Sequence, residues 1–271
     1  MTHLGSPLRL SAPVVENRAE GGPHHRLVLG LERWPGFQPG QFVMLSPGVQ
    51  GGASRADPLL PRPMAIYRVR GQGERTQLEI LYKVTGRGTA LLRDAGPGDF
   101  VGMVGPLGEG FPPPPPSSVA LLVGGGTGIA SLYELAAREA GRASLVVLLG
   151  ARCASDLMGH DDFAALPLEL AIATEDGSAG ERGLVTELLE RRLTGSDVTV
   201  YACGPTPMMR RAAELAVARG ARCLVSLENH MACGFGVCLG CAVPRREGGY
   251  GLVCREGPVF EATAVDWAEV P

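Results

Sequence analysis

The chain of 271 residues lacks three features that would assign it to a membrane or to a nucleic acid. No run approaches the roughly 18 apolar residues of a membrane-spanning helix. The N-terminal sequence M-T-H-L-G-S-P has neither the basic flank nor the apolar core of a signal peptide. An excess of positive charge is also missing, because 25 Lys and Arg residues stand against 28 Asp and Glu, a net charge of −3. We therefore expect a cytoplasmic protein that binds no membrane and no nucleic acid.

Cysteine is present in an odd number, seven, which does not suit a framework of paired disulfides. Clustered thiols in a reducing compartment are more often metal ligands than disulfides. Three of the seven lie apart from the others. We expect Cys153 and Cys223 to be small buried or surface thiols, whereas Cys203 belongs to a motif described below.

The other four cysteines form the most specific pattern in the sequence, C-x4-C-x2-C-x12-C. Plant-type [2Fe–2S] clusters are held by four thiolates with the same C-x4-C-x2-C core and a more distant fourth ligand. Interspersed glycines would supply turns with positive φ and N–H groups directed at sulfur. A structural zinc site or a disulfide pair is the alternative, although zinc sites prefer two short cysteine pairs. The predicted ligands are Cys233, Cys238, Cys241 and Cys254.

The chain changes its pattern at Pro112 to Pro116, an unbroken proline run that predicts a domain boundary. Before it, short alternating apolar segments separated by Gly and Pro predict antiparallel strands and a small β-barrel. After it, apolar strands alternate with helical periodicity, which predicts βαβ units and a parallel sheet. We therefore expect an α+β multidomain protein with a β-barrel at 1–112, a Rossmann-like parallel α/β domain at 117–222 and a small C-terminal metal module at 223–271.

Two motifs in the α/β half predict a nucleotide site. A glycine-rich turn, G-G-G-T-G, joins the first strand to its helix, where backbone N–H groups could face a pyrophosphate; a plain tight turn is the alternative. The motif A-C-G-P ends a later strand at the same carboxyl edge, where open α/β sheets bind ligands. The candidate residues are Gly124, Gly125, Gly126, Thr127, Gly128, Cys203, Gly204 and Pro205.

Charged residues near this edge leave the type of dinucleotide open. Glu175 and Asp176 follow a predicted strand and could accept hydrogen bonds from a ribose, or could be surface turn residues. Arg152 follows the second strand of this half and keeps a 2′-phosphate possible.

In the barrel half, the segment R-P-M-A-I begins a strand after a proline-rich loop. Arg62 could clamp a phosphate through two hydrogen bonds, although a single arginine at a strand edge is usually only solvated. The segment T-G-R-G-T suits a pyrophosphate, and a plain turn capped by Thr89 explains the same letters.

Together the motifs P-G-Q-F-V, R-P-M-A-I, G-R-G-T, G-P-L-G-E-G-F, G-G-G-T-G and A-C-G-P, in this order, resemble the ferredoxin reductase-like flavoproteins over nearly the whole chain. The appended cysteine motif resembles the electron-transfer subunits of NAD-dependent dihydroorotate dehydrogenases. The resemblance implies FAD, NAD and a [2Fe–2S] cluster as cofactors. It also implies a partner, the FMN-containing catalytic subunit, in a heterotetramer with two copies of each chain.

In that family the R-P motif, the next strand and a G-T pair contact FAD. The resemblance thus implies FAD-binding roles for Arg62, Pro63, Met64, Ala65, Leu81, Tyr82, Lys83, Gly88 and Thr89. Ala65 replaces a serine that is common in the family, so a hydroxyl contact near flavin N5 is lost or supplied elsewhere.

The implied function is transfer of electrons from the catalytic subunit through the [2Fe–2S] cluster and FAD to NAD+ in pyrimidine biosynthesis, with no certain catalytic residue for dihydroorotate in this chain. A flavin is needed between a hydride carrier and a one-electron cluster. Two alternatives remain: a related NAD(P)H:ferredoxin or sulfhydrogenase-type reductase subunit, and a non-catalytic zinc-binding regulatory module.

Overall fold

The computed structural model of the chain describes residues 6–48, 60–71, 73–116, 118–141 and 144–270. The expected domain limits at residues 1, 117 and 271 lie outside these ranges. In the described part of the chain, no helix is long and apolar enough to cross a membrane.

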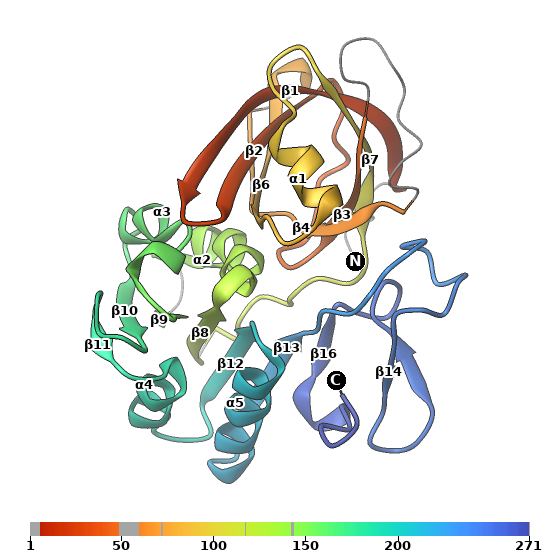
Figure 1. The fold of residues 1–271 in the computed structure, drawn as a ribbon. Helices are drawn as coiled ribbons and strands as arrows, with labels where there is room; N and C mark the ends of the chain where they lie inside the picture. Colours follow the sequence, from red (N-terminus) through yellow and green to blue (C-terminus); the bar gives the residue numbers. More distant parts are fainter. Residues whose placement is uncertain (1–5, 49–59, 72, 117, 142–143, 271) are drawn as a thin grey trace.

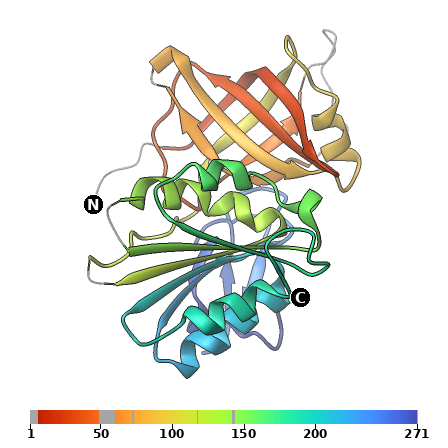
Figure 2. The same ribbon diagram turned by 90° about the vertical axis from the view of Figure 1, so that its left-hand side faces the viewer.

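The first half of the chain folds into a seven-stranded antiparallel sheet that curls into a barrel (Figures 1 and 2). The sheet order is β4-β3-β7-β1-β2-β6-β5. Strands β2, β3 and β6 are buried along most of their length and fill the barrel with apolar side chains such as Leu27, Val43 and Ile80, none of which is exposed. Its elements are β1 (Leu8–Gly21), β2 (His24–Leu31), β3 (Phe42–Pro47), β4 (Arg62–Ala65), β5 (Arg68–Arg70), β6 (Thr76–Lys83), α1 (Arg87–Arg93) and β7 (Phe100–Leu107), with the short 3-10 helix η1 (Gly73–Arg75) before β6.

The second half builds a sheet with the order β11-β10-β9-β8-β12-β13-β16. Neighbouring strands from β11 to β13 in this order pair parallel, and the chain returns between them through crossover connections. Strand β16 pairs antiparallel with β13. Helices cover both faces of this sheet (Figure 2). The strands are β8 (Val119–Gly125), β9 (Ser144–Ala151), β10 (Glu169–Thr174), β11 (Glu181–Arg182), β12 (Val198–Cys203), β13 (Arg222–Ser226) and β16 (Val259–Glu261).

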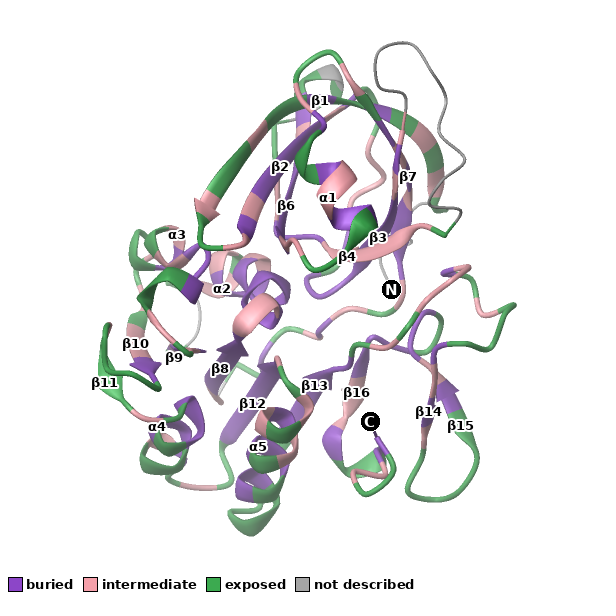
Figure 3. Ribbon diagram, viewed as in Figure 1, coloured by how far each residue is buried: buried purple, intermediate pink, exposed green. Residues whose placement is uncertain are grey.

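The helices of this half are α2 (Tyr133–Glu139), α3 (His160–Ala164), α4 (Val185–Arg192), α5 (Thr206–Ala218) and the 3-10 helices η2 (Gly126–Ser131), η3 (Ala154–Asp156) and η4 (Ala262–Ala264). Two buried layers flank the sheet, one under α4 and α5 and one under η2 and α2 (Figure 3). The fold class expected from the sequence is confirmed: an antiparallel barrel, a parallel α/β domain and a C-terminal cysteine segment.

The C-terminal segment shares this second sheet. Strand β13 crosses the boundary expected after residue 222, β16 lies beyond it, and together they complete the edge of the sheet. Among the described strands of this segment, the hairpin of β14 (Ala242–Pro244) and β15 (Tyr250–Leu252) stands outside it. Val243, Val253 and Val265 are buried in the same core as the strands of the parallel sheet. The limits of the three domains stay a prediction.

Candidate flavin, nucleotide and cluster sites

Two cavities meet where the barrel faces the carboxyl edge of the parallel sheet. One, of about 370 Å³, lies between β4, β6 and the chain after β13. The other, of about 640 Å³, lies over the ends of β8, β9 and β12. Lys83, Thr127, Leu227 and Glu228 line both cavities. The two cavities are therefore adjacent, and ligands bound in them would lie next to each other.

The smaller cavity contains the residues that the sequence predicts for FAD. With one exception, every predicted residue contributes to its lining: Arg62, Pro63, Met64, Ala65, Leu81, Tyr82, Lys83 and Thr89. The exception is Gly88, which lies directly beneath the Arg62 side chain, because a Cβ built on Gly88 would lie 2.1 Å from Arg62 Nε. Glycine at this position leaves room for the guanidinium group.

Arg62 lines this cavity, and its guanidinium group donates a hydrogen bond to the carbonyl oxygen of Leu60. The N–H groups of a guanidinium fit an anionic ligand such as a pyrophosphate. Thr89 has a local role. Its hydroxyl oxygen accepts hydrogen bonds from the backbone N–H groups of Thr85 and Gly86, at 3.0 and 3.1 Å, and so orders the turn that leads into α1.

The larger cavity contains part of the predicted nucleotide set. Gly125, Gly126, Thr127, Gly204 and Pro205 line it. The remaining predicted residues, Gly124, Gly128 and Cys203, lie behind the turn, since none of them belongs to the lining.

Two of these residues pack against each other. A Cβ on Gly128 would lie 2.4 Å from the carbonyl group of Cys203, so glycine allows the turn after β8 to pack on the end of β12. The Cys203 side chain is fully buried, and burial together with the charge of Glu228 raises the pKa of its thiol to about 12. Cys203 is therefore a neutral thiol that supports the turn.

The charged residues at this edge differ in their surroundings. Arg152 lines the cavity but forms an ion pair with Asp156 at 2.8 Å, which offsets its charge. Glu175 lines the cavity as well. Asp176 is a surface turn residue: it accepts hydrogen bonds from the Ser178 N–H and hydroxyl groups, which lower the pKa of the Asp176 carboxyl group. Because Asp156 pairs with Arg152 and Glu175 lines the same cavity, this edge favours a ribose with a free 2′-hydroxyl group over one with a 2′-phosphate.

Sequence reasoning missed several residues of these cavities, of which Glu228 is the most distinctive. It lies in the shared wall of the two cavities and is an exposed residue there. Its backbone follows β13, so the carboxyl-edge rule could have identified it. His24, from the start of β2, also reaches the larger cavity, and no motif marks it.

The cysteine loop arranges its four thiols as two pairs. Cys241 Sγ and Cys254 Sγ are 3.2 Å apart. The thiols of Cys233 and Cys238 also interact, and backbone N–H groups of Phe235, Cys238 and Val237 outweigh burial and lower the pKa of Cys233 to about 6. A thiol with such a pKa is largely a thiolate at neutral pH, the form that binds metal.

Backbone N–H groups also point at the second pair. Gly236 N–H donates to Cys254 Sγ at 3.0 Å and Cys254 N–H donates to Cys241 Sγ at 3.4 Å. Gly236 has a φ of +79°, which a residue with a Cβ rarely adopts. In the described residues, no three His, Cys, Asp or Glu side chains converge as they would on one metal ion. Two thiol pairs with sulfur-directed N–H groups fit a cluster of two iron atoms, each held by one pair.

The cysteine loop lies beside the smaller cavity. A Cβ on Gly234 would lie 2.7 Å from the side chain of Met44 in β3, so the loop packs directly on the barrel. Asn229 and Met231, which lead into the loop, line the smaller cavity. The far side of the loop is exposed and apolar, with Phe235 51%, Val237 80% and Leu239 63% exposed.

Comparison with known proteins gives two family matches. Residues 228–266 match the iron-sulfur cluster binding domain of dihydroorotate dehydrogenase B, and residues 122–214 match the oxidoreductase NAD-binding domain. The electron transfer subunit of dihydroorotate dehydrogenase B (NAD(+)) from Bacillus caldolyticus is 44% identical over 233 residues, which cover 84% of this chain and 86% of the relative. The subunit with the same name from Caldanaerobacter subterraneus is 36% identical and covers 96% and 97% of the two chains.

Solved structures show the same fold. A chain from the NADH-dependent reduced ferredoxin-NADP oxidoreductase, studied for flavin-based electron bifurcation, superposes with a TM-score of 0.81 at 28% identity and covers 99% of this chain and 92% of that one. The ferredoxin reductase of carbazole 1,9a-dioxygenase gives a TM-score of 0.66 at 21% identity over 79% of this chain and 67% of that chain, a likeness of fold alone.

Proposed function

Since the chain belongs to the family of electron transfer subunits of dihydroorotate dehydrogenase B (NAD(+)), we propose that it carries electrons from a separate catalytic subunit to NAD+ in pyrimidine biosynthesis. The observation that carries this proposal is the order of three sites in space. The cysteine loop packs on the barrel beside the smaller cavity, and that cavity shares a wall with the larger one. Electrons would have a short path from the exposed loop to the nucleotide.

Different sets of residues would hold the three cofactors, FAD, NAD and a [2Fe–2S] cluster. When bound, the cluster supplies one-electron transfer and FAD supplies the conversion between single electrons and hydride. Arg62 would hold the FAD pyrophosphate over Gly88, and β4 and β6 would wall the flavin ring. The glycine turn after β8 and Gly204-Pro205 would hold NAD, with Arg152 neutralised by Asp156. The two thiol pairs would hold the cluster.

We propose further that the catalytic subunit carries FMN, that two copies of each chain form a heterotetramer, and that the complex works in the cytoplasm. A reducing compartment fits the seven cysteines, all of which lie within the described residues and none of which forms a disulfide there. Native mass spectrometry of the co-purified complex would give both the stoichiometry and the bound flavins. A heterodimer with a single copy of each chain would contradict the heterotetramer.

The test of the function is co-expression with a candidate FMN subunit, followed by an assay of dihydroorotate-dependent NAD+ reduction. We expect a coloured complex with flavin and cluster absorbance that reduces NAD+ and leaves NADP+ nearly untouched. A colourless, zinc-containing protein would overturn the redox function. Reduction of NADP+ or ferredoxin with no response to dihydroorotate would instead assign the chain to a related reductase.

The exposed apolar side of the cysteine loop supports contact with the catalytic subunit. Val237 lies in sequence between Cys233 and Cys238, the residues of the first thiol pair, and is 80% exposed. We expect Val237→Asp to weaken the complex by about 10–100-fold, because an unpaired charge buried in an interface costs a few kcal/mol. The cluster spectrum should not change. Val217→Asp, on the 57% exposed Val217 of α5, is the matched control. Equal affinities of both variants, measured by titration of labelled subunits, would exclude this surface.

A further inference from the structure

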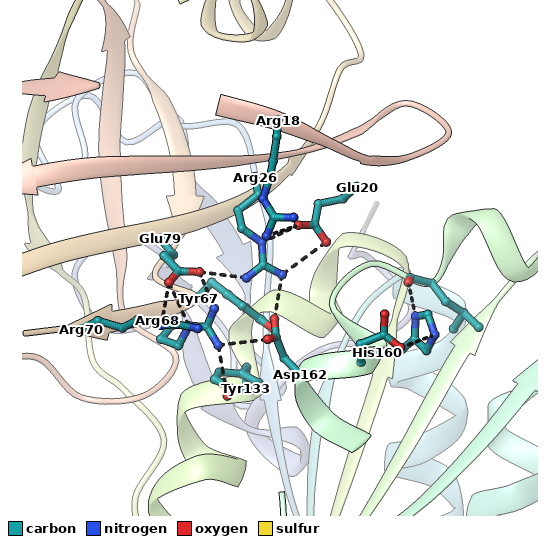
Figure 4. A network of polar contacts seen from close by, with 12 residues as sticks. Arg18, Glu20, Arg26, Tyr67, Arg68, Arg70, Glu79, Tyr133, His160 and Asp162 are labelled. Carbon is teal, nitrogen blue, oxygen red and sulfur yellow. Dashed lines mark hydrogen bonds and ion pairs between the residues drawn. The ribbon is translucent and has the colours of Figure 1, made fainter. Parts of the chain in front are cut away.

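A buried polar network joins the barrel to helix α3 of the nucleotide half, away from the residues that line the two cavities (Figure 4). We propose that Asp162 of α3 is a positioning residue, which fixes the nucleotide half against the barrel and thereby sets the geometry of hydride transfer between the two cavities. The inference rests on the proposed function, because it concerns the step between a nicotinamide and a flavin.

Within this network, the hydrogen bonds that the Asp162 carboxylate accepts all come from residues of the barrel. Its Oδ2 accepts from Arg26 Nη2 and from the Tyr67 hydroxyl group, both at 2.7 Å. Its Oδ1 accepts from Arg68 Nη1 at 3.1 Å. The three donors come from β2, from the residue pair after β4, and from β5. One carboxylate of the nucleotide half therefore connects two parts of the barrel, β2 and the Tyr67-Arg68 segment (Figure 4).

The arginines of the network are already paired within the barrel. Glu79 of β6 accepts from Arg26 Nη1 at 2.8 Å and from Arg68 Nη2 at 2.6 Å, and Glu20 of β1 also pairs with Arg26. Loss of the Asp162 charge would therefore leave each arginine with a partner, so the barrel itself should stay folded. The contribution of Asp162 acts between the halves.

Burial makes these contacts strong and directional. The side chains of Arg26 and Glu79 are each 5% exposed, that of Arg68 is 11% exposed and that of Asp162 is 22% exposed. Burial raises the pKa of Asp162, but hydrogen bonds from Arg26 and the Tyr67 hydroxyl group, together with the charges of both arginines, outweigh it and lower that pKa. Asp162 is thus ionised at neutral pH and forms charge-assisted hydrogen bonds.

Close packing gives the network a fixed register. Gly159, at the start of α3, has a φ of +67°, and a Cβ on it would lie 2.8 Å from the Tyr67 hydroxyl group and 2.9 Å from Leu81 Cδ1. The ring of Tyr67 lies 4.5 Å from that of Tyr133, which in turn lies 5.1 Å from the ring of Phe163 in α3. Polar and apolar contacts therefore select the same position of α3.

Residues of the network are joined through neighbouring chain segments to the walls of both cavities. Tyr67 follows β4, whose residues Arg62–Ala65 line the flavin cavity, and Leu81 lines the same cavity. On the other side, α3 follows the segment from Arg152 to Asp156, whose end residues line the nucleotide cavity. A shift of α3 on the barrel would move one cavity wall relative to the other. A misplacement of about 1 Å between reacting groups costs up to roughly 100-fold in rate.

The test is stopped-flow reduction of the intact complex by NADH, with three variants. We expect Asp162→Asn to lower the rate of flavin reduction at saturating NADH by about tenfold or more, with FAD content, cluster spectrum and NADH affinity within about twofold of wild type. Tyr67→Phe, which keeps the ring and removes one donor, should show a smaller loss. The matched control is Asp161→Asn on the same helix, since the Asp161 side chain is 93% exposed and contacts only His160 among the ion pairs.

Different results separate the possible failures. A wild-type rate of flavin reduction in Asp162→Asn would overturn the positioning role. Loss of FAD or of thermal stability in Asp162→Asn would also overturn it, because it would assign the network to folding alone. If NADH fails to reduce the wild-type complex, the proposed function itself is wrong.

Discussion

Replacement of Cys238 by serine will remove the cluster from the protein and interrupt electron exchange with the catalytic subunit. Cys238 is the exposed member of the first thiol pair, so its loss would leave one iron of the proposed cluster with a single thiolate from the chain. Changes in the surroundings of a metal ligand alone cost about 10–100-fold in affinity or activity, so loss of a ligand should exceed that range. Reduction of FAD by NADH should stay within about twofold of wild type, because the nucleotide and flavin cavities contain none of these thiols.

The measurement is visible absorbance and electron paramagnetic resonance of the purified complex, combined with two assays. Dihydroorotate-dependent NAD+ reduction should fall to the background level, whereas NADH oxidation by an artificial acceptor should continue. Cys153→Ser is the matched control, because Cys153 is a half-buried free thiol outside the loop. An unchanged cluster spectrum in Cys238→Ser would remove Cys238 from the ligand set.

Replacement of Gly88 by alanine will weaken FAD binding with little effect on the apoprotein. The new Cβ would overlap the guanidinium group of Arg62, which is the flexible end of a long side chain and can move aside at small cost to stability. Movement of Arg62 would remove the charge-assisted hydrogen bonds that we propose it donates to the pyrophosphate, and such bonds are worth about 1.5–3 kcal/mol. That energy corresponds to roughly 10–150-fold in the FAD dissociation constant.

The chain offers a close control for this variant. Gly86, two residues earlier in the same turn, has a φ of −165° and no atom within 4 Å of a Cβ built on it. Gly86→Ala should therefore bind FAD like wild type, and Arg62→Ala should resemble Gly88→Ala. Fluorescence titration of the apoprotein with FAD measures all three. Equal dissociation constants for the Gly86 and Gly88 variants would argue against a clamp formed by Arg62.

Much of the fold could be predicted because its signals are local. Alternation along β1 to β7, the proline run and the βαβ pattern each concern residues that are neighbours in sequence. Cysteine spacing predicted the cluster type in the same way, and the matched iron-sulfur domain agrees with it. The FAD and NAD residues stay predictions, although the structure gathers most of them around two cavities. Gly124, Gly128 and Cys203 show the limit of a motif: it identifies the turn but not which of its residues face the ligand.

What could not be predicted depends on pairs that are distant in sequence. Arg26 and Asp162 are 136 positions apart, and neither belongs to a motif. Glu228 is a single acidic residue whose importance comes from lying where two cavities meet. The antiparallel addition of β16 to β13 likewise follows from a three-residue strand, which is too short to show a period.

That last pairing determines what a shortened chain would do. A protein ending near residue 227 would retain β13 but lose β16, and would expose the backbone edge along Leu224 to Ser226 together with the core that Val259 and Ala262 cover. Uncovered apolar edges recruit strands from other molecules. The C-terminal cysteine segment is thus an integral part of the second sheet. A protein that retains the flavin and nucleotide sites without the cluster should therefore be made by substitution of cysteines, because a truncated chain is expected to aggregate.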